Sequence, residues 1–208
     1  MRSLKKLPEP EVVTANQKVW TEKYLEAKTT GQKLPSAWSH PKIRETLQAE
    51  TDSRCAYCDS HLAHVASSHI EHYRPRSLYP ELVVAWENLT VACPRCNSSK
   101  SDLFSEDLPF INPFLDEPDE HFVFFGELVL APSSQRGEYT ISELGLNNDD
   151  LMSARKRRLN NIVQLVSSWH KAHDLLKPGI LDEIRRQLDQ GEYQASVKSL
   201  LKTLNFKV

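Results

Sequence analysis

The four cysteines of the chain form two Cys-x-x-Cys pairs, Cys55 with Cys58 and Cys93 with Cys96. Two such pairs allow four thiolates to converge tetrahedrally on one Zn²⁺. Because four thiolates leave no open coordination position, the spacing predicts a structural zinc. Any catalytic chemistry would then belong to the residues between the pairs and directly after them.

A histidine-rich tetrapeptide, His69-Ile-Glu-His72, lies between the two cysteine pairs. It is expected to form a short strand that ends ahead of Pro75, because proline terminates regular strand pairing. Glu71 beside His72 at a strand end could place a hard oxygen ligand and an imidazole base around one small cavity.

Asn97 and Lys100 directly follow the second cysteine pair. They are three positions apart on an expected short helix and therefore share a face. Asn97 offers a carbonyl oxygen suited to Mg²⁺, and Lys100 offers a positive charge for phosphate. A base, an oxygen-rich metal site and a nearby cation together indicate phosphodiester hydrolysis.

The motif order is Cys-x-x-Cys, Ile-Glu-His-Tyr-Arg-Pro, Trp-Glu-Asn-Leu and Cys-x-x-Cys-Asn-x-x-Lys. It resembles the HNH, or ββα-metal, nucleases in their zinc-stapled form. The whole chain is most similar to the small HNH proteins of bacterial anti-phage operons, the Septu-type and retron-linked nucleases. The arm at residues 4–10 and the Phe110-Ile-Asn-Pro113 segment also fit that group.

The resemblance implies a role for each matching residue. His72 would be the general base, and Asn88 would brace the loop and orient that histidine. Asn97 would bind the catalytic Mg²⁺ or Mn²⁺ in the last motif position, where this chain has asparagine instead of histidine. Glu71 would be the other metal-binding side chain, in a position where many members have aspartate.

Three cations near the motif, Arg74, Arg76 and Lys100, are candidate contacts to DNA phosphate. Such contacts position DNA without reading its sequence. The resemblance further implies an ABC-type ATPase partner from the same operon. Two alternatives stay open: a zinc-organised interaction module with an inactive HNH core, and a stand-alone restriction or mobile-element HNH nuclease.

The elements around the motif predict an α+β fold in four parts. Residues 1–51 would form an arm and helices, 52–108 the HNH core, 109–148 a β-hairpin extension and 149–208 a helical region. Helices are expected at 11–28, from Pro41, from about 149 to 175, and at 180–190 and 192–204, with a break at Pro178-Gly179. The segment Asn147-Asn148-Asp149 is expected to cap the helix that begins at about residue 149. Strands are expected at 122–125 and 128–130, with a further strand at 139–141.

Composition limits the class of protein. A chain of 208 residues with 39% hydrophobic residues can bury a core as one elaborated domain or two small ones. It contains no apolar run long enough to cross a membrane and no signal-peptide pattern, which predicts a cytoplasmic protein. The net charge of -2 means that any DNA-binding surface must be a local patch. The basic run at 155–158 is either such a patch or a solvated helix face.

Several further residues are expected to have no catalytic role. Histidines 61, 64 and 69 are interpreted as surface or supporting residues, and His170 with His173 as a solvated pair on one helix face. The tryptophans at positions 20, 38, 86 and 169 are expected to be packing residues.

Overall fold

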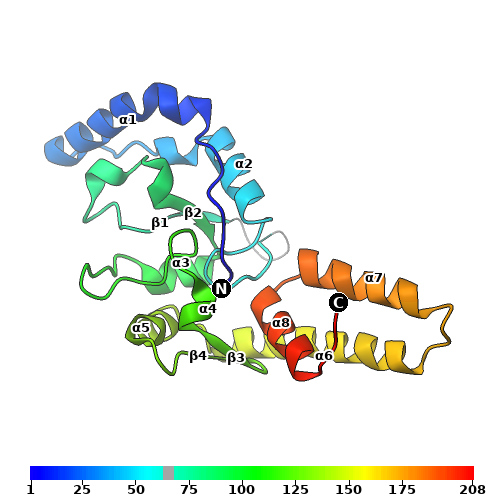
Figure 1. Cartoon of the computed structure of the whole chain (residues 1–208). Helices are drawn as coiled ribbons and strands as arrows, with labels where there is room; N and C mark the ends of the chain where they lie inside the picture. Colours follow the sequence, from blue (N-terminus) through cyan, green and yellow to red (C-terminus); the bar gives the residue numbers. More distant parts are fainter. Residues whose placement is uncertain (63–67) are drawn as a thin grey trace.

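The computed structural model describes residues 1–62 and 68–208 and has a mixed α+β architecture, which confirms the predicted fold class (Figure 1). Its helices and strands in these residues are α1 (Glu11–Thr30), α2 (Pro41–Glu50), β1 (His69–His72), β2 (Leu89–Ala92), α3 (Pro94–Lys100), α4 (Pro118–His121), β3 (Val123–Phe125), β4 (Leu128–Leu130), α5 (Gln135–Glu143), α6 (Asp149–Lys171), α7 (Lys177–Gln190) and α8 (Gln194–Thr203). Short 3₁₀ turns occur at Ala37–Ser39, Pro80–Leu82 and Trp86–Asn88.

The centre of the fold is a β1–β2 hairpin followed by α3. The two strands pair antiparallel, from His69 opposite Ala92 to His72 opposite Leu89. Pro94 begins α3, a position that needs no backbone donor, and the Cys93 sulfur accepts a hydrogen bond from the Cys96 amide. The helix therefore starts directly at the second cysteine pair and packs against both strands.

The N-terminal residues wrap one side of this centre (Figure 1). The arm before α1 is extended, and Trp86 Nε1 donates to Leu7 O at 2.8 Å. Helix α1 ends at Gly31, whose φ of 68° is readily adopted by glycine. Tyr24 of α1 packs with Val83 and Val84, so α1 supports the loop that connects β1 to β2.

The β3–β4 hairpin confirms the two strands expected around Gly126. The further strand expected at 139–141 is wrong, because these residues belong to α5. The Ser134 hydroxyl caps this helix by accepting from Gly137 N at 3.0 Å, and Thr140 is buried, with its hydroxyl accepting from Ile111 N. The cap and the helical spacing of the buried positions outweigh the strand preference of the local sequence.

The C-terminal helices α6, α7 and α8 enclose a second apolar cluster around Ile162, Ile184 and Val197. Asn148 caps α6, as expected, by accepting from Leu151 N at 3.0 Å. Pro178 and Gly179 lie within the first turn of α7 instead of between two helices, because proline is tolerated at that position.

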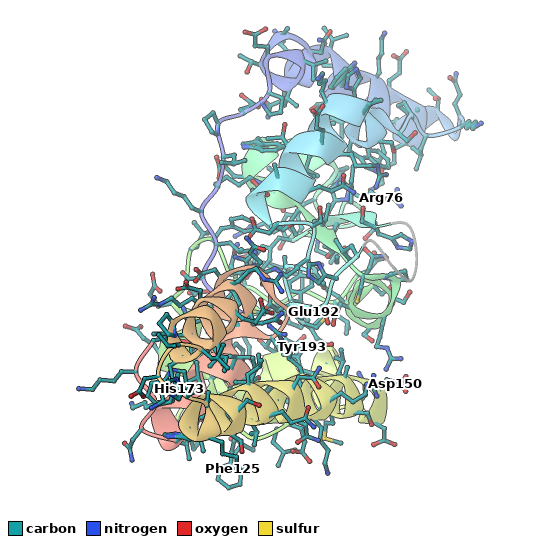
Figure 2. The ribbon with its side chains drawn as sticks, turned by 90° about the vertical axis from the view of Figure 1, so that its right-hand side faces the viewer. Arg76, Phe125, Asp150, His173, Glu192 and Tyr193 are labelled. Atoms are coloured by element: carbon teal, nitrogen blue, oxygen red, sulfur yellow. The ribbon has the colours of Figure 1, made fainter. Side chains whose placement is uncertain are left out.

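The α7–α8 loop, which carries Glu192 and Tyr193 (Figure 2), attaches these helices to the residues directly after the first cysteine pair. Tyr193 Oη and Ser60 Oγ are 2.8 Å apart, and Gln194 N donates to Asp59 Oδ2 at 2.8 Å. No helix among the described residues has the length and apolarity needed to span a membrane. The division of the chain into four regions stays a prediction.

Candidate active site and zinc site

The four cysteine sulfurs gather in one place, with all four atoms within 4.8 Å of one another. Cys58 Sγ and Cys93 Sγ are 3.8 Å apart although they are 35 positions apart in the chain. Thiolates at about 2.3 Å from a tetrahedral Zn²⁺ stand about 3.8 Å from each other. The arrangement therefore fits a structural zinc, as the sequence predicts.

The zinc site joins the first cysteine pair to the ββα centre. Ala56 N, between Cys55 and Cys58, donates to Val91 O of β2 at 3.0 Å. Cys93 and Cys96 lie at the junction of β2 and α3. One ion would thus hold the first pair, the strand end and the helix start together.

His72 lies at the end of β1 with 6% of its surface exposed. Its Nε2 is 2.8 Å from Val83 O, and a carbonyl oxygen can only accept, so Nε2 carries the proton. Burial lowers the pKa of His72 to about 4, with a further contribution from the positive charge of Arg76. The ring is therefore neutral at pH 7, and Nδ1 keeps a free lone pair that can accept a proton.

Glu71 is buried beside His72 and is engaged by two side chains. Lys100 Nζ lies 2.7 Å from Glu71 Oε1, and Tyr57 Oη donates to the same oxygen at 3.4 Å. Burial raises the pKa of Glu71, and the charge of Lys100 opposes that shift. Both of these side-chain contacts are made to Oε1.

Lys100 is fully buried, and its Nζ also donates to His72 O at 2.9 Å. The predicted contact between Lys100 and phosphate does not fit this geometry, because the ammonium group faces Glu71 and the backbone of β1. The three-residue spacing from Asn97 indicates a shared helix face, but it does not show that this face turns inward at Lys100. Lys100 instead braces the two residues that carry the candidate chemistry.

Asn97 on α3 is half-buried and lines a groove of about 660 Å³ together with Glu71 and His72. Within the described residues its side-chain amide forms no hydrogen bond with the protein. A carboxylate oxygen and an amide oxygen are ligands suited to Mg²⁺ or Mn²⁺, with water completing the shell. The donor set therefore fits a hard divalent ion held by Glu71 and Asn97.

Asn88 braces the loop between β1 and β2. Its Oδ1 accepts from Arg74 N at 2.7 Å, and its Nδ2 donates to Arg74 O at 3.0 Å and Leu82 O at 3.2 Å. This loop carries Val83, whose carbonyl holds the His72 ring. Asn88 thus acts on the position of His72 through the backbone and does not touch the imidazole.

The two arginines after His72 have different surroundings. Arg74 forms a two-pronged ion pair with Glu106, at 2.6 and 3.1 Å, and lies against the rings of Tyr79 and Phe104. Arg76 lines the groove and lies over the Trp38 ring at 4.9 Å. Arg76 is therefore the cation of this pair that is placed for phosphate.

Sequence reasoning missed several residues of the groove, among them Trp38 and Arg44. Trp38 packs as expected, but its partner is the His72 ring, edge-on at 5.3 Å. Arg44 comes from α2. The sequence carries no signal for either contact, because both residues precede the motif and reach the groove only through the tertiary fold.

Of the other histidines singled out in the sequence, one lines the groove. His69 is exposed on β1 and also lines the groove, while His61 lies by the α7–α8 loop. His64 falls outside the described residues. The expected shared face of His170 and His173 is wrong, since α6 ends at Lys171 and His173 follows in a turn.

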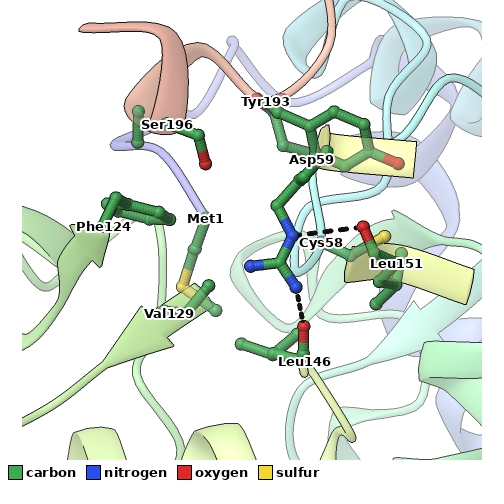
Figure 3. Close-up of a pocket in the computed structure, with 11 residues that line it drawn as sticks. Met1, Cys58, Asp59, Phe124, Val129, Leu146, Leu151, Tyr193 and Ser196 are labelled. Carbon is green, nitrogen blue, oxygen red and sulfur yellow. Dashed lines mark hydrogen bonds between the residues drawn. The ribbon is translucent and has the colours of Figure 1, made fainter. Parts of the chain in front are cut away.

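The basic run at 155–158 has a partly structural role. Arg155 is buried, and its guanidinium donates to the carbonyl oxygens of Leu146 and Leu151, drawn as dashed lines in Figure 3. Arg158 donates to the side chain and backbone of Gln187. Two of its four cations therefore hold α6 to its neighbours, so the run is not a wholly solvated face, while Lys156 and Arg157 are exposed.

A ββα unit joined to a four-cysteine cluster, with a buried histidine next to a glutamate and near an asparagine, is the arrangement that the sequence predicts for an HNH nuclease. In agreement, residues 55–103 match the protein family described as HNH endonuclease, so the chain contains an HNH endonuclease domain.

Two relatives share the name Septu protein PtuB. The protein from Bacillus thuringiensis is 36% identical over 129 residues, which are 60% of this chain and 50% of that protein. The protein from Bacillus mycoides (strain KBAB4) is 28% identical over 199 residues, which are 78% of this chain and 68% of that protein. The match to the first relative thus spans half of its length. The catalytic and metal-binding roles of the individual residues stay predictions.

Proposed function

We propose that this protein is a metal-dependent endonuclease that hydrolyses DNA phosphodiester bonds. The observation that carries the proposal is the groove in which His72 and two oxygen ligands meet. The HNH domain supports the reaction class. A zinc-organised interaction module would need the cysteines, but it would not need a neutral, fixed imidazole beside Glu71 and Asn97.

The residues divide the reaction between them. His72 Nδ1 takes a proton from the water that attacks phosphorus, while the Val83 carbonyl keeps the ring oriented. Glu71 and Asn97 would hold a divalent ion, which would supply positive charge to stabilise the phosphate in the transition state. Arg76 binds a phosphate oxygen and positions the strand. The bond to the leaving 3′ oxygen then breaks, and that oxygen gains a proton from solvent.

The biological role that we propose is the effector nuclease of a bacterial anti-phage system. The name Septu of the two relatives supports this role. An ABC-type ATPase encoded in the same operon would be the partner. With a net charge of -2, the isolated chain has little positive surface for DNA, so the partner would supply the missing contacts.

Asn97→Ala is expected to lower cleavage by at least about 10-fold and to raise the Mg²⁺ concentration needed for half-maximal activity, because one oxygen ligand is lost. Asn97→Asp should retain much of the activity, since it keeps an oxygen donor. Cleavage of a plasmid across a Mg²⁺ titration measures both effects. An unchanged dependence on Mg²⁺ in Asn97→Ala would show that Asn97 is not a metal ligand. Asn16→Ala on α1 is the control, because it removes an amide side chain far from the motif in the sequence.

The ATPase partner is expected to co-purify with this chain and to contact the C-terminal helices. Truncation at residue 176 would be a poor test, because it removes Ile184 from the second cluster and Tyr193 from the first cysteine pair. Point substitutions are sharper: Leu175 and Leu176, between α6 and α7, are 84% and 63% exposed. The double variant Leu175→Asp/Leu176→Asp should weaken co-purification.

The matched control for that pull-down is Leu115→Asp, because Leu115 is 81% exposed but lies outside the C-terminal helices. Equal loss of the partner in both variants would contradict docking on the C-terminal helices. Rapid DNA cleavage by the chain alone at physiological salt would favour a stand-alone restriction or mobile-element nuclease.

A further inference from the structure

Arg44 on α2 reaches the same groove as His72, although it lies outside the HNH domain. One nitrogen of its guanidinium, Nη1, donates to Ser68 O at 2.6 Å and to Ser68 Oγ at 3.2 Å. Ser68 directly precedes β1. The contact therefore fixes the guanidinium next to the strand that carries Glu71 and His72.

Arg44 forms no ion pair with a carboxylate in the described part of the chain. The neighbouring cations differ: Lys100 pairs with Glu71, and Arg74 pairs with Glu106. Among residues 1–62 and 68–208, no carboxylate lies within ion-pair distance of Arg44 or Arg76. They are the two cations of the groove that form no ion pair in these residues, although the carboxylate of Asp102 also lines the groove.

We propose that Arg44 is a second phosphate-binding residue of the groove and that it holds the nucleic-acid strand together with Arg76. The inference rests on the proposed nuclease function and names a substrate contact for that site. Only one nitrogen of the Arg44 fork is used by Ser68, so Nε and Nη2 keep donors for phosphate oxygens. Because the fork is already held, little side-chain entropy is lost when phosphate binds.

Trp38 positions the other cation of the groove, Arg76. Arg76 lies over its ring at 4.9 Å, and the same ring meets Tyr24 of α1 edge-on at 5.8 Å. Figure 2 shows Arg76 beside the N-terminal helices. The N-terminal residues therefore contribute one phosphate-binding side chain directly and orient the other. They are part of the nucleic-acid site as well as a cover for the core.

The salt dependence of DNA binding tests this role. Binding of a fluorescein-labelled DNA duplex, and of the single strand of the same sequence, is measured by anisotropy in the His72→Gln background without added Mg²⁺ or Mn²⁺, so that the DNA stays intact. Arg44→Gln should weaken binding by roughly 10-fold at low salt and reduce the slope of log Kd against log salt by about one. Arg44→Lys should keep the slope, because it keeps the charge.

The control is Lys42→Gln. Lys42 lies two positions before Arg44 on α2, is exposed and pairs with Glu45. It should leave both Kd and slope unchanged. If Arg44 served only to tie α2 to Ser68, Arg44→Gln and Arg44→Lys would bind DNA alike, and that result would overturn the inference. An unaltered slope of log Kd against log salt in Arg44→Gln would also overturn the role of Arg44. If the wild type still cleaved DNA, the proposed nuclease function would be unaffected by that result. Absence of DNA binding and cleavage by the wild type would contradict both.

Discussion

Cys93→Ala is expected to unfold the HNH domain and to abolish zinc binding. The four sulfurs join the first cysteine pair, β2 and α3, and loss of one thiolate opens the coordination shell. Structural zinc contributes on the order of 10 kcal/mol to the folding of small domains, which is comparable with the whole stability of a domain. Circular dichroism and metal analysis of the purified variant measure the effect.

No cysteine outside the zinc site is available as a control, because all four cysteines of the chain belong to that site. The suitable control is therefore Ser60→Ala, next to Cys58, which should keep one equivalent of zinc. A folded Cys93→Ala protein with normal thermal stability, or a wild type without zinc, would contradict a structural metal.

His72→Gln is expected to reduce DNA cleavage by about 10² to 10⁴-fold, the usual contribution of a general base. Glutamine is preferred to alanine because its amide nitrogen can still donate to Val83 O, whereas alanine would leave that carbonyl without its partner at a cost of about 1–3 kcal/mol. The variant should therefore bind zinc and melt close to the wild-type temperature while losing activity.

Two histidine variants control for this result. His170→Ala, on α6, should keep full activity, and His69→Ala should keep much of it even though His69 lines the groove. If His69 proved essential and His72 dispensable, the motif would have been placed in the wrong register. Plasmid cleavage at matched zinc content provides the comparison.

The sequence predicts the features that depend on local spacing. The two cysteine pairs specify the zinc site, and Asn148 ahead of an apolar helical pattern specifies α6. The strand at His69–His72 follows from the position of Pro75 and from the motif. Each of these predictions depends only on one short segment of the sequence, or on segments that share one metal ion.

The features that the sequence did not predict depend on the tertiary environment. Lys100 lies three positions after Asn97, a spacing that suggests a phosphate contact. In the folded chain its neighbour is Glu71, and the two side chains form a buried ion pair. Arg155 belongs to a basic run, yet it is buried under carbonyl oxygens. Trp38 and Arg44 reach the groove only after α1 and α2 have packed on the ββα centre.

The central claim is that one metal folds this protein and a second metal lets it cut DNA. It is tested most directly by adding divalent ions to zinc-loaded full-length protein from which all other metals have been removed, with and without the co-purified partner. We expect cleavage of supercoiled plasmid only after Mg²⁺ or Mn²⁺ is added, with zinc content unchanged, and faster cleavage with the partner. Cleavage with zinc alone, or no cleavage with any ion in the presence of the partner, would contradict the account.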